Sequence, residues 1–132
     1  MLNTMPNGNS YDTYKQAAVN TASPEKLLIM LFNGGIKFIH LADQAIEAKD
    51  YTTADKMLLR IQDILMELIL TLDMNQGDIS KNLRRLYEFY HHEVVQTNLY
   101  KDAKRLGPVL EFFMLYRDTW VEVAKKARLG TK

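Results

Sequence analysis

The apolar residues of the segment 24–49 recur with helical spacing, and this register constrains the fold more than any other feature of the sequence. At about 100° per residue, they fall in one arc of about 140°. The residues of this arc are Leu28, Leu31, Phe32, Gly35, Phe38, Ile39, Ala42, Ala45 and Ile46. Ser23 is a typical N-cap, Pro24 suits the first helical position, and Glu25 suits the positive end of the helix dipole. The segment is therefore predicted to be one helix.

Asn33-Gly34, in the middle of this segment, is a competing signal. Between two apolar runs, Asn-Gly is typical of a type I′ β-hairpin. The helical register nevertheless continues through both residues, whereas two hairpin strands would have no reason to keep it. We therefore favour the helix, in which each glycine costs about 1 kcal/mol relative to alanine. Gly35 falls on the core side, where the missing side chain would let a neighbouring helix approach closely.

Three more segments with helical spacing follow, at about residues 53–74, 78–101 and 102–128. The inward positions predicted for the first of them are Met57, Leu58, Ile61, Ile64, Leu65, Leu68 and Leu72. Those of the next are Ile79, Leu83, Leu86, Tyr87, Tyr90, Val94 and Thr97. Those of the last are Leu106, Val109, Leu110, Phe113, Tyr116, Trp120 and Ala124. Gly107-Pro108 should kink the last helix or delay its start to about residue 107.

The connections between these segments, near residues 50–52, 75–77 and 101–102, are short, which favours antiparallel neighbours. Residues from 24 on contain no β-type alternation. The sequence therefore predicts an all-α fold, an antiparallel four-helix bundle. We expect residues 1–13 to form a flexible N-terminal arm and residues 14–132 to form a single helical-bundle domain that begins with a short helical turn.

Composition excludes several classes of function. Apolar residues make up 47% of the 132 residues, which is enough to bury a core. The 17 basic and 16 acidic residues are nearly balanced, and no basic run exceeds two residues, so no nucleic-acid partner is indicated. Cysteine is absent, which excludes disulfides and thiolate catalysis. Residues 1–20 contain no apolar run and no stretch of about 18 apolar residues exists, so neither a signal peptide nor membrane insertion is expected.

Two of the predicted helices carry apolar residues on the side opposite their core. On the second helix these are Leu59, Met66 and Leu70, with Ile69 beside them; on the first they are Met30 and Leu41, with Ile29 and Ile36 at the flanks. One interpretation is crowding, because scattered surface hydrophobes are normal and the N-terminal arm could cover some of them. The other is a surface for an amphipathic partner helix, to which methionine lends adaptability.

His91-His92-Glu93 is the most prominent polar cluster, and it does not predict an enzyme. Glu88 and His91 make one Glu-x-x-His pair, whereas a di-iron bundle needs a second pair and two further glutamates. His92 is predicted on the outer face. Asn33-Gly34-Gly35 lacks the pattern of a phosphate-binding loop. We therefore expect no catalytic residues, no metal and no cofactor.

Several stretches are similar to a known family, the flagellar secretion chaperone FliS. They are Tyr14-Lys15-Gln16, Val19-Asn20-Thr21-Ala22-Ser23-Pro24, Leu27, Met30-Leu31-Phe32-Asn33-Gly34, Leu86-Tyr87-Glu88-Phe89, Asn98 before Asp102, and Arg117-Asp118-Thr119-Trp120. The resemblance covers nearly the whole chain from Tyr14 to about Trp120. One departure is His92-Glu93, where the family usually carries a basic pair.

The resemblance implies a cytoplasmic export chaperone. Members of the family bind the disordered C-terminal segment of flagellin, which wraps around the bundle and becomes partly helical. They hold it until it reaches the flagellar type III export apparatus, and export-gate components or flagellar regulators are further partners to consider. A helical adaptor or regulator that docks another folded protein is the alternative from a different class.

We expect the partner to contact both outer apolar stripes and the residues that precede the first helix. The predicted contact residues are Tyr14, Thr21, Ala22, Pro24, Ile29, Met30, Asn33, Ile36, Leu59, Met66 and Leu70. Residues 1–10 would lie over this surface in the absence of a partner. Tyr14 and the turn Thr21–Pro24 have an alternative interpretation: they could cap the helix and pack the arm instead of contacting a partner. Tyr87 and Trp120 are assigned to the core.

Overall fold

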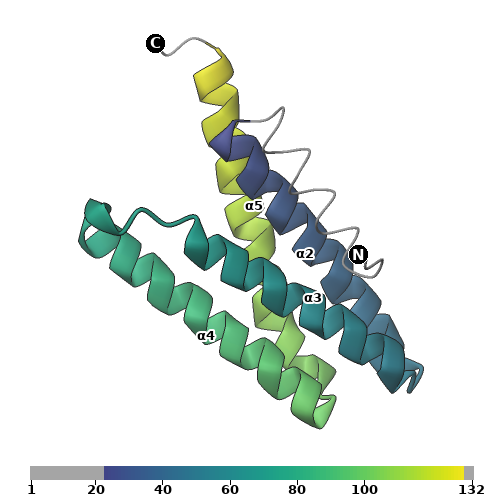
Figure 1. Ribbon diagram of the computed structural model, residues 1–132. Coiled ribbons are helices and arrows are strands. Elements are labelled where there is room, and N and C mark those ends of the chain that lie inside the picture. The colour runs from purple at the N-terminus through teal and green to yellow at the C-terminus, as the bar shows by residue number, and fades with distance from the viewer. Residues whose placement is uncertain (1–22, 130–132) are drawn as a thin grey trace, which may run out of the picture.

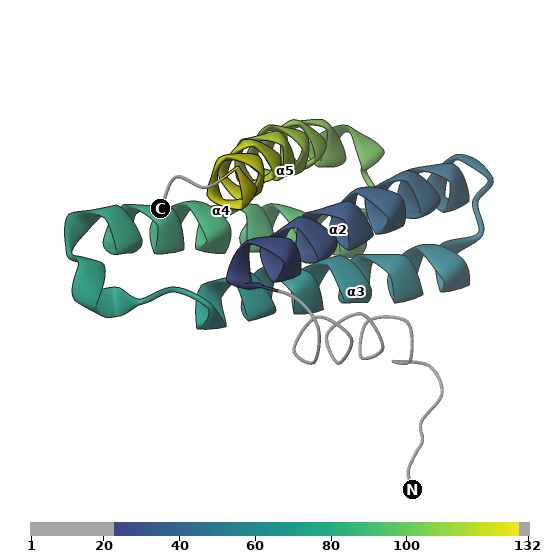
Figure 2. The same cartoon turned by 90° about the horizontal axis from the view of Figure 1, so that it is seen from above.

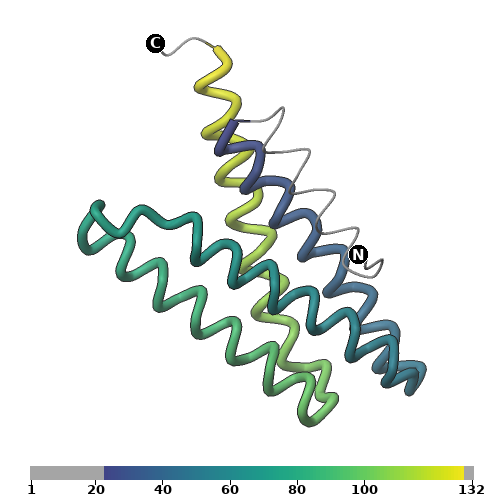
Figure 3. The backbone as a smooth tube through the Cα atoms, viewed as in Figure 1, coloured from purple at the N-terminus to yellow at the C-terminus, as the bar shows by residue number. Residues whose placement is uncertain are grey.

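The computed structural model describes residues 23–129 and shows four α-helices packed against one another (Figure 1). Helix α2 spans Pro24–Glu47, α3 Tyr51–Leu70, α4 Asp78–Tyr100 and α5 Leu106–Arg128. Two short 3₁₀ helices, η2 at Met74–Gln76 and η3 at Ala103–Arg105, lie in the connections before and after α4. Successive helices run in opposite directions along the chain (Figure 3). The prediction of an all-α, antiparallel four-helix bundle is confirmed.

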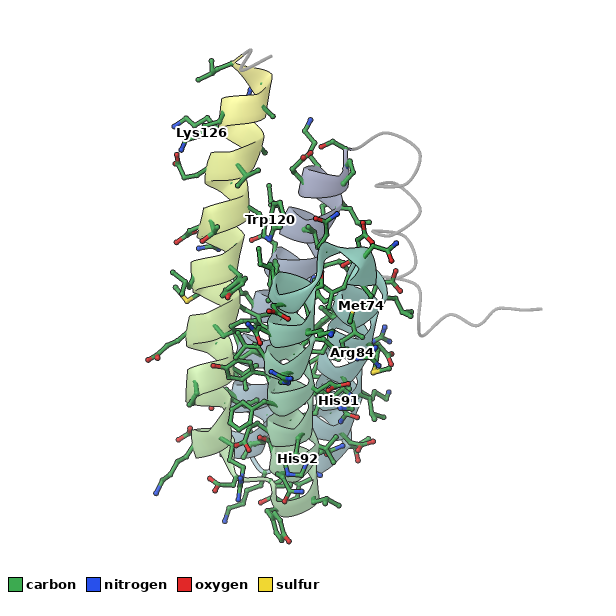
Figure 4. The ribbon with its side chains drawn as sticks, turned by 90° about the vertical axis from the view of Figure 1, so that its left-hand side faces the viewer. Met74, Arg84, His91, His92, Trp120 and Lys126 are labelled. Atoms are coloured by element: carbon green, nitrogen blue, oxygen red, sulfur yellow. The ribbon has the colours of Figure 1, made fainter. Side chains whose placement is uncertain are left out.

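Helix α2 lies between α3 and α5, and α3 also packs against α4 (Figure 2). Helices α4 and α5 share a much smaller contact. They lie close together at the η3 end of the bundle and separate toward the other end, where α5 extends past α4 (Figures 1 and 4). The bundle is therefore closed around α2 and α3 and open between α4 and α5.

The helix ends follow from local hydrogen bonds. The Ser23 Oγ accepts a hydrogen bond of 3.3 Å from the backbone N–H of Lys26, as an N-cap does. The Asp50 carboxylate accepts one of 3.2 Å from the N–H of Thr53 and caps α3. Helix α3 ends at Leu70, earlier than the predicted boundary near residue 74, and a 3₁₀ turn follows. Short polar side chains thus set the starts of both α2 and α3.

Gly34 and Gly35 lie inside α2, which is continuous from Pro24 to Glu47. The prediction of a helix in place of a hairpin is confirmed. Gly35 is buried, and a β-carbon built at this position would overlap the ring of Phe113 on α5. The predicted close approach of a neighbouring helix at Gly35 is therefore confirmed as well.

The core is formed by the predicted apolar stripes and contains a cluster of aromatic rings. The fully buried large side chains are Tyr87, Phe32, Phe113, Ile39, Leu58, Ile61, Ile64, Leu65, Leu68, Val94, Val109 and Thr97. Phe32 of α2 meets Phe113 of α5 edge to face, with 5.4 Å between ring centroids. Tyr87 is 1% exposed and Trp120 packs against the core partly buried, which agrees with their assignment to the core.

Two inward positions were predicted incorrectly on α4 and α5. Ile79, which the sequence places in the core, is 77% exposed. It lies in the first turn of α4, where α5 has already moved away, so no neighbouring helix covers it. Phe112, which the prediction leaves out, is 5% exposed because it packs against Tyr87 and Tyr90 of α4. Helix α5 starts at Leu106, so the predicted delay caused by Gly107-Pro108 is confirmed.

Candidate partner-binding surface

Three apolar side chains of α3 form an exposed stripe on its outer side. Leu59 and Met66 are each 46% exposed, and Leu70 is 74% exposed. Their spacings of seven and four residues place them on one side of the helix. Leu58, next to Leu59, is fully buried, so the stripe lies on the face turned away from the core. We call Leu59, Met66 and Leu70 the α3 stripe.

The residues predicted on α2 lie on two different sides of that helix. Met30, Asn33, Gly34 and Lys37 line a surface hollow of about 300 Å³. The Asn33 Oδ1 accepts a hydrogen bond of 3.4 Å from Arg117 of α5. Asn33 is therefore at the boundary between the hollow and the side of α2 that faces α5.

Ile29 and Ile36 belong to the α5 side of α2. They precede and follow Asn33 by four and three positions, which places them on its side of the helix. Both are half-buried, and Ile36 packs against the core. The sequence places Ile29 and Ile36 at the flanks of the core and Met30 opposite it, and the partial burial of the two isoleucines agrees with a flanking position.

The predicted contacts that precede α2 are only partly within the described residues. Pro24 is the first residue of α2 and is exposed. Tyr14, Thr21 and Ala22 lie outside the described residues, as do the predicted arm of residues 1–13 and the short helical turn. The neighbouring Ser23 caps α2, because its Oγ accepts a hydrogen bond from the backbone N–H of Lys26.

The structure also exposes apolar side chains of α4 and α5 that the sequence prediction did not place at the surface. Phe89 and Ile79 of α4 are 53% and 77% exposed, and Leu115 and Val123 of α5 are 62% and 39% exposed. A signal for this exposure was present in the run Phe112-Phe113-Met114-Leu115, because four consecutive apolar residues cannot all face one core.

A comparison with known protein families identifies the family to which this chain belongs. The sequence model of the family described as "Flagellar protein FliS" matches residues 7–127. The chain belongs to the FliS family. This match includes every stretch quoted for the resemblance, so that identification is confirmed.

Several curated relatives carry the name "Flagellar secretion chaperone FliS". The protein of Bacillus subtilis is 37% identical over 120 residues, which cover 91% of this chain and 90% of the relative. That of Vibrio cholerae is 29% identical over 119 residues, 86% of this chain and 88% of the relative. That of Salmonella typhimurium is 29% identical over 114 residues, 85% of this chain and 84% of the relative. All three of these relatives of the FliS-family chain are thus named as secretion chaperones.

The polar cluster on α4 of this FliS-family chain has a structural explanation. The Glu93 carboxylate pairs with the Arg105 guanidinium of η3 at 3.4 Å, which ties α4 to the connection before α5. His91 is half-buried, and burial lowers its pKa, while the nearby Asp63 opposes and His92 adds to that effect. His92 is exposed, and Figure 4 shows both histidines on α4. Within the described part of the chain, no three His, Cys, Asp or Glu side chains come close enough to hold a metal ion.

Across residues 23–129, no helix combines the length and the apolar character that crossing a bilayer requires. The exposed apolar residues are distributed as stripes on amphipathic helices, which suits contact with another polypeptide segment.

Proposed function

We propose that this FliS-family chain is a cytoplasmic export chaperone for flagellin. It binds the disordered C-terminal segment of flagellin, prevents that segment from associating with other flagellin molecules, and delivers it to the flagellar type III export apparatus. The observation that carries the proposal is the match to the FliS family, whose relatives are named flagellar secretion chaperones. The exposed α3 stripe supports it, because a chaperone for an apolar segment needs an apolar surface of its own.

The mechanism is coupled folding and binding without ATP. A flagellin segment that forms helices in the filament carries apolar faces, and these faces would associate with one another in the cytoplasm. When the segment folds onto the chaperone, burial of those faces is offset by about 2–5 kcal/mol or more of ordering entropy. The complex therefore covers a long segment at moderate affinity, and a competitor for the same faces releases it.

The proposed contact surface consists of the α3 stripe, the hollow on α2 and the residues that precede α2. Met30 lines the hollow, and Met66 lies in the stripe; both side chains adapt readily to the shape of a partner. Asn33 can offer its amide to a partner's backbone at the edge of the hollow. Tyr14, Thr21, Ala22 and Pro24 are proposed as one anchor, with Ile29 and Ile36 as contacts on the α5 side of α2.

The test is calorimetry of the full chain against a synthetic peptide of the cognate flagellin C-terminus. We expect binding with a large negative heat-capacity change and a gain of helical circular dichroism. Flagellin that lacks this segment is the matched control and should not bind. If the peptide does not bind, or if truncated flagellin binds as well as the intact protein, the proposal is wrong and an adaptor for a folded partner is favoured. Export-gate components and regulators would be assayed against the preformed complex.

A further inference from the structure

The pair Asn33-Gly34 in the middle of α2 combines two residues that can react with each other. The backbone nitrogen of the residue after an asparagine can attack the side-chain amide carbon and close a cyclic imide. Glycine in the second position allows this most readily, because no side chain shields its nitrogen and its backbone turns freely. The chain contains one other such pair, Asn7-Gly8, which lies outside the described residues. A reactive pair is therefore part of a core helix.

The side chain of Asn33 is open to solvent in the folded protein. Asn33 is exposed, and together with Met30 and Lys37 it lines the hollow of about 300 Å³ on α2. Its Oδ1 accepts the hydrogen bond of 3.4 Å from Arg117. Burial therefore does not shield this amide, and its reactivity depends on the backbone around it.

The helical backbone keeps the Gly34 nitrogen away from the amide carbon of Asn33. In an α-helix each N–H donates to the carbonyl four residues earlier, and α2 is continuous through Gly34, so this nitrogen is engaged. A helical ψ of about −42° also turns the nitrogen out of the plane of the imide that would form. Ring closure thus requires α2 to open at this point. Two consecutive glycines have low helix propensity, which favours opening there.

The contact of α2 with α5 depends on an unaltered backbone at position 33. Phe32 meets Phe113 with 5.4 Å between ring centroids, and Gly35 lies directly against the same ring. An isoaspartate at position 33 would route the main chain through the former side chain and add one methylene between Phe32 and Gly35. A regular helix could then no longer present both residues to Phe113, because its rise per residue is fixed.

We propose that Asn33-Gly34 is a site of spontaneous deamidation that the folded α2 suppresses, and that its product marks chains in which α2 has opened. Chains that form aspartate refold, because the new carboxylate lies at an exposed position beside Arg117. Chains that form isoaspartate do not rebuild α2 against α5. This inference does not depend on the proposed function.

The reaction needs only water. The Gly34 nitrogen forms a bond to Asn33 Cγ, the bond from Cγ to Nδ2 breaks, and ammonia leaves with the proton of the Gly34 N–H. Water then opens the imide at either carbonyl carbon, which gives aspartate or isoaspartate. It supplies the hydroxyl of the new carboxyl group and the proton that restores the Gly34 N–H.

The test incubates the full chain at mildly alkaline pH, folded in buffer and unfolded in guanidinium chloride, and follows each asparagine by peptide mapping with mass spectrometry. We expect Asn33 to convert in the unfolded chain, and at least about tenfold more slowly in the folded chain, because only the open fraction reacts. Asn82 and Asn98 are each followed by leucine and serve as internal controls that should keep their amides. Equal rates at Asn33 in both states, or no conversion in guanidinium chloride, would overturn the proposal.

Gly34→Ala tests the sequence requirement in guanidinium chloride, where the fold plays no part. The methyl group should slow ring closure at Asn33, because it shields the attacking nitrogen and restricts the backbone. A rate equal to that of the wild-type chain would exclude the proposed role of Gly34.

Refolding tests the effect of the product on α2. The chain carries Asn7→Gln, so that the other Asn-Gly pair does not contribute, and Asn7→Gln/Asn33→Gln is the matched control. After incubation in guanidinium chloride and dilution into buffer, the helical circular dichroism that is not recovered should follow the fraction of isoaspartate at position 33. The control should recover its full signal. Full recovery by chains rich in isoaspartate would contradict the proposed effect on α2.

Discussion

Gly35 of α2 lies directly against the ring of Phe113 of α5, and this contact fixes how closely the two helices approach. Both residues are buried, and Phe113 also meets Phe32 edge to face. A methyl group at position 35 would overlap the Phe113 ring. Gly35, which directly follows the turn-like pair Asn33-Gly34, is therefore a packing residue.

Gly35→Ala should destabilise the protein. Alanine improves helix propensity by about 1 kcal/mol, but overpacking a well-packed core costs about 1–3 kcal/mol or more. Because the overlap is with a buried ring, the cost should lie at the upper end of this range, and we expect a net loss of about 2 kcal/mol or more in the free energy of unfolding measured with urea. Gly107→Ala is the control, because a β-carbon there has no neighbour within 4 Å. Equal stability of the two variants would show that α2 and α5 do not meet as described.

Leu58→Ala and Leu59→Ala should differ strongly in their effect on stability, although the two residues are neighbours on α3. Leu58 is fully buried, so its truncation should cost about 2–5 kcal/mol. Leu59 is 46% exposed, so its truncation should change the free energy of unfolding by only about 0.5 kcal/mol. Chemical denaturation measures both values. A large loss for Leu59→Ala would mean that the α3 stripe is covered within the protein.

Leu59→Asp/Met66→Asp should weaken binding of the flagellin C-terminal peptide without unfolding the bundle. Two charges placed in the α3 stripe oppose burial of an apolar partner, so we expect a loss of about tenfold or more in affinity. Calorimetry measures the affinity, and circular dichroism checks the fold. Leu129→Asp, at a 75% exposed position after α5, serves as the control. Wild-type affinity of a folded double variant would place the contact elsewhere.

Lys49→Gly should stabilise the end of α2. Lys49 has φ of 60°, in the left-handed region that favours glycine. The N–H of Asp50 donates to the Ala45 carbonyl at 2.8 Å and that of Lys49 to Ile46 at 3.0 Å, which is the Schellman pattern. We expect a gain of about 0.5–1 kcal/mol in unfolding free energy. The same substitution at the exposed mid-helix Lys37 should instead cost about 1 kcal/mol. Destabilisation by Lys49→Gly would contradict the backbone geometry.

Asp50→Asn should reduce the loss of stability in acid. The hydrogen bonds with Thr53 hold the pKa of Asp50 below its ordinary value, and Lys56 adds a smaller effect in the same direction. The stabilisation is therefore fully present above the ordinary aspartate pKa of about 3.9 and is lost as the pH falls through the lower, folded-state pKa. Asparagine can still cap α3 but does not titrate. The measurement is the urea midpoint of unfolding at neutral pH and at a pH below the folded-state pKa of Asp50. The midpoint should fall less between these two conditions for Asp50→Asn than for the wild type. An equal fall for both proteins would exclude a contribution from Asp50.

The helices of this protein were determined by sequence alone, because helix formation depends on neighbours three and four positions apart. Ser23 and Pro24 start α2, its register continues through Gly35, and the core stripes follow from the same period. The same period predicted that the residues of the α3 stripe face away from the core, and they are exposed.

Only the tertiary structure decided which outer surfaces remain uncovered. Helical periodicity tells which residues share a side of a helix, but not which neighbour packs there or where two helices separate. Ile79 is exposed because α5 has moved away from the first turn of α4, and Asn33 faces α5 because Arg117 reaches it. Angles between helices depend on contacts such as that of Gly35 with Phe113, which join residues far apart in the chain.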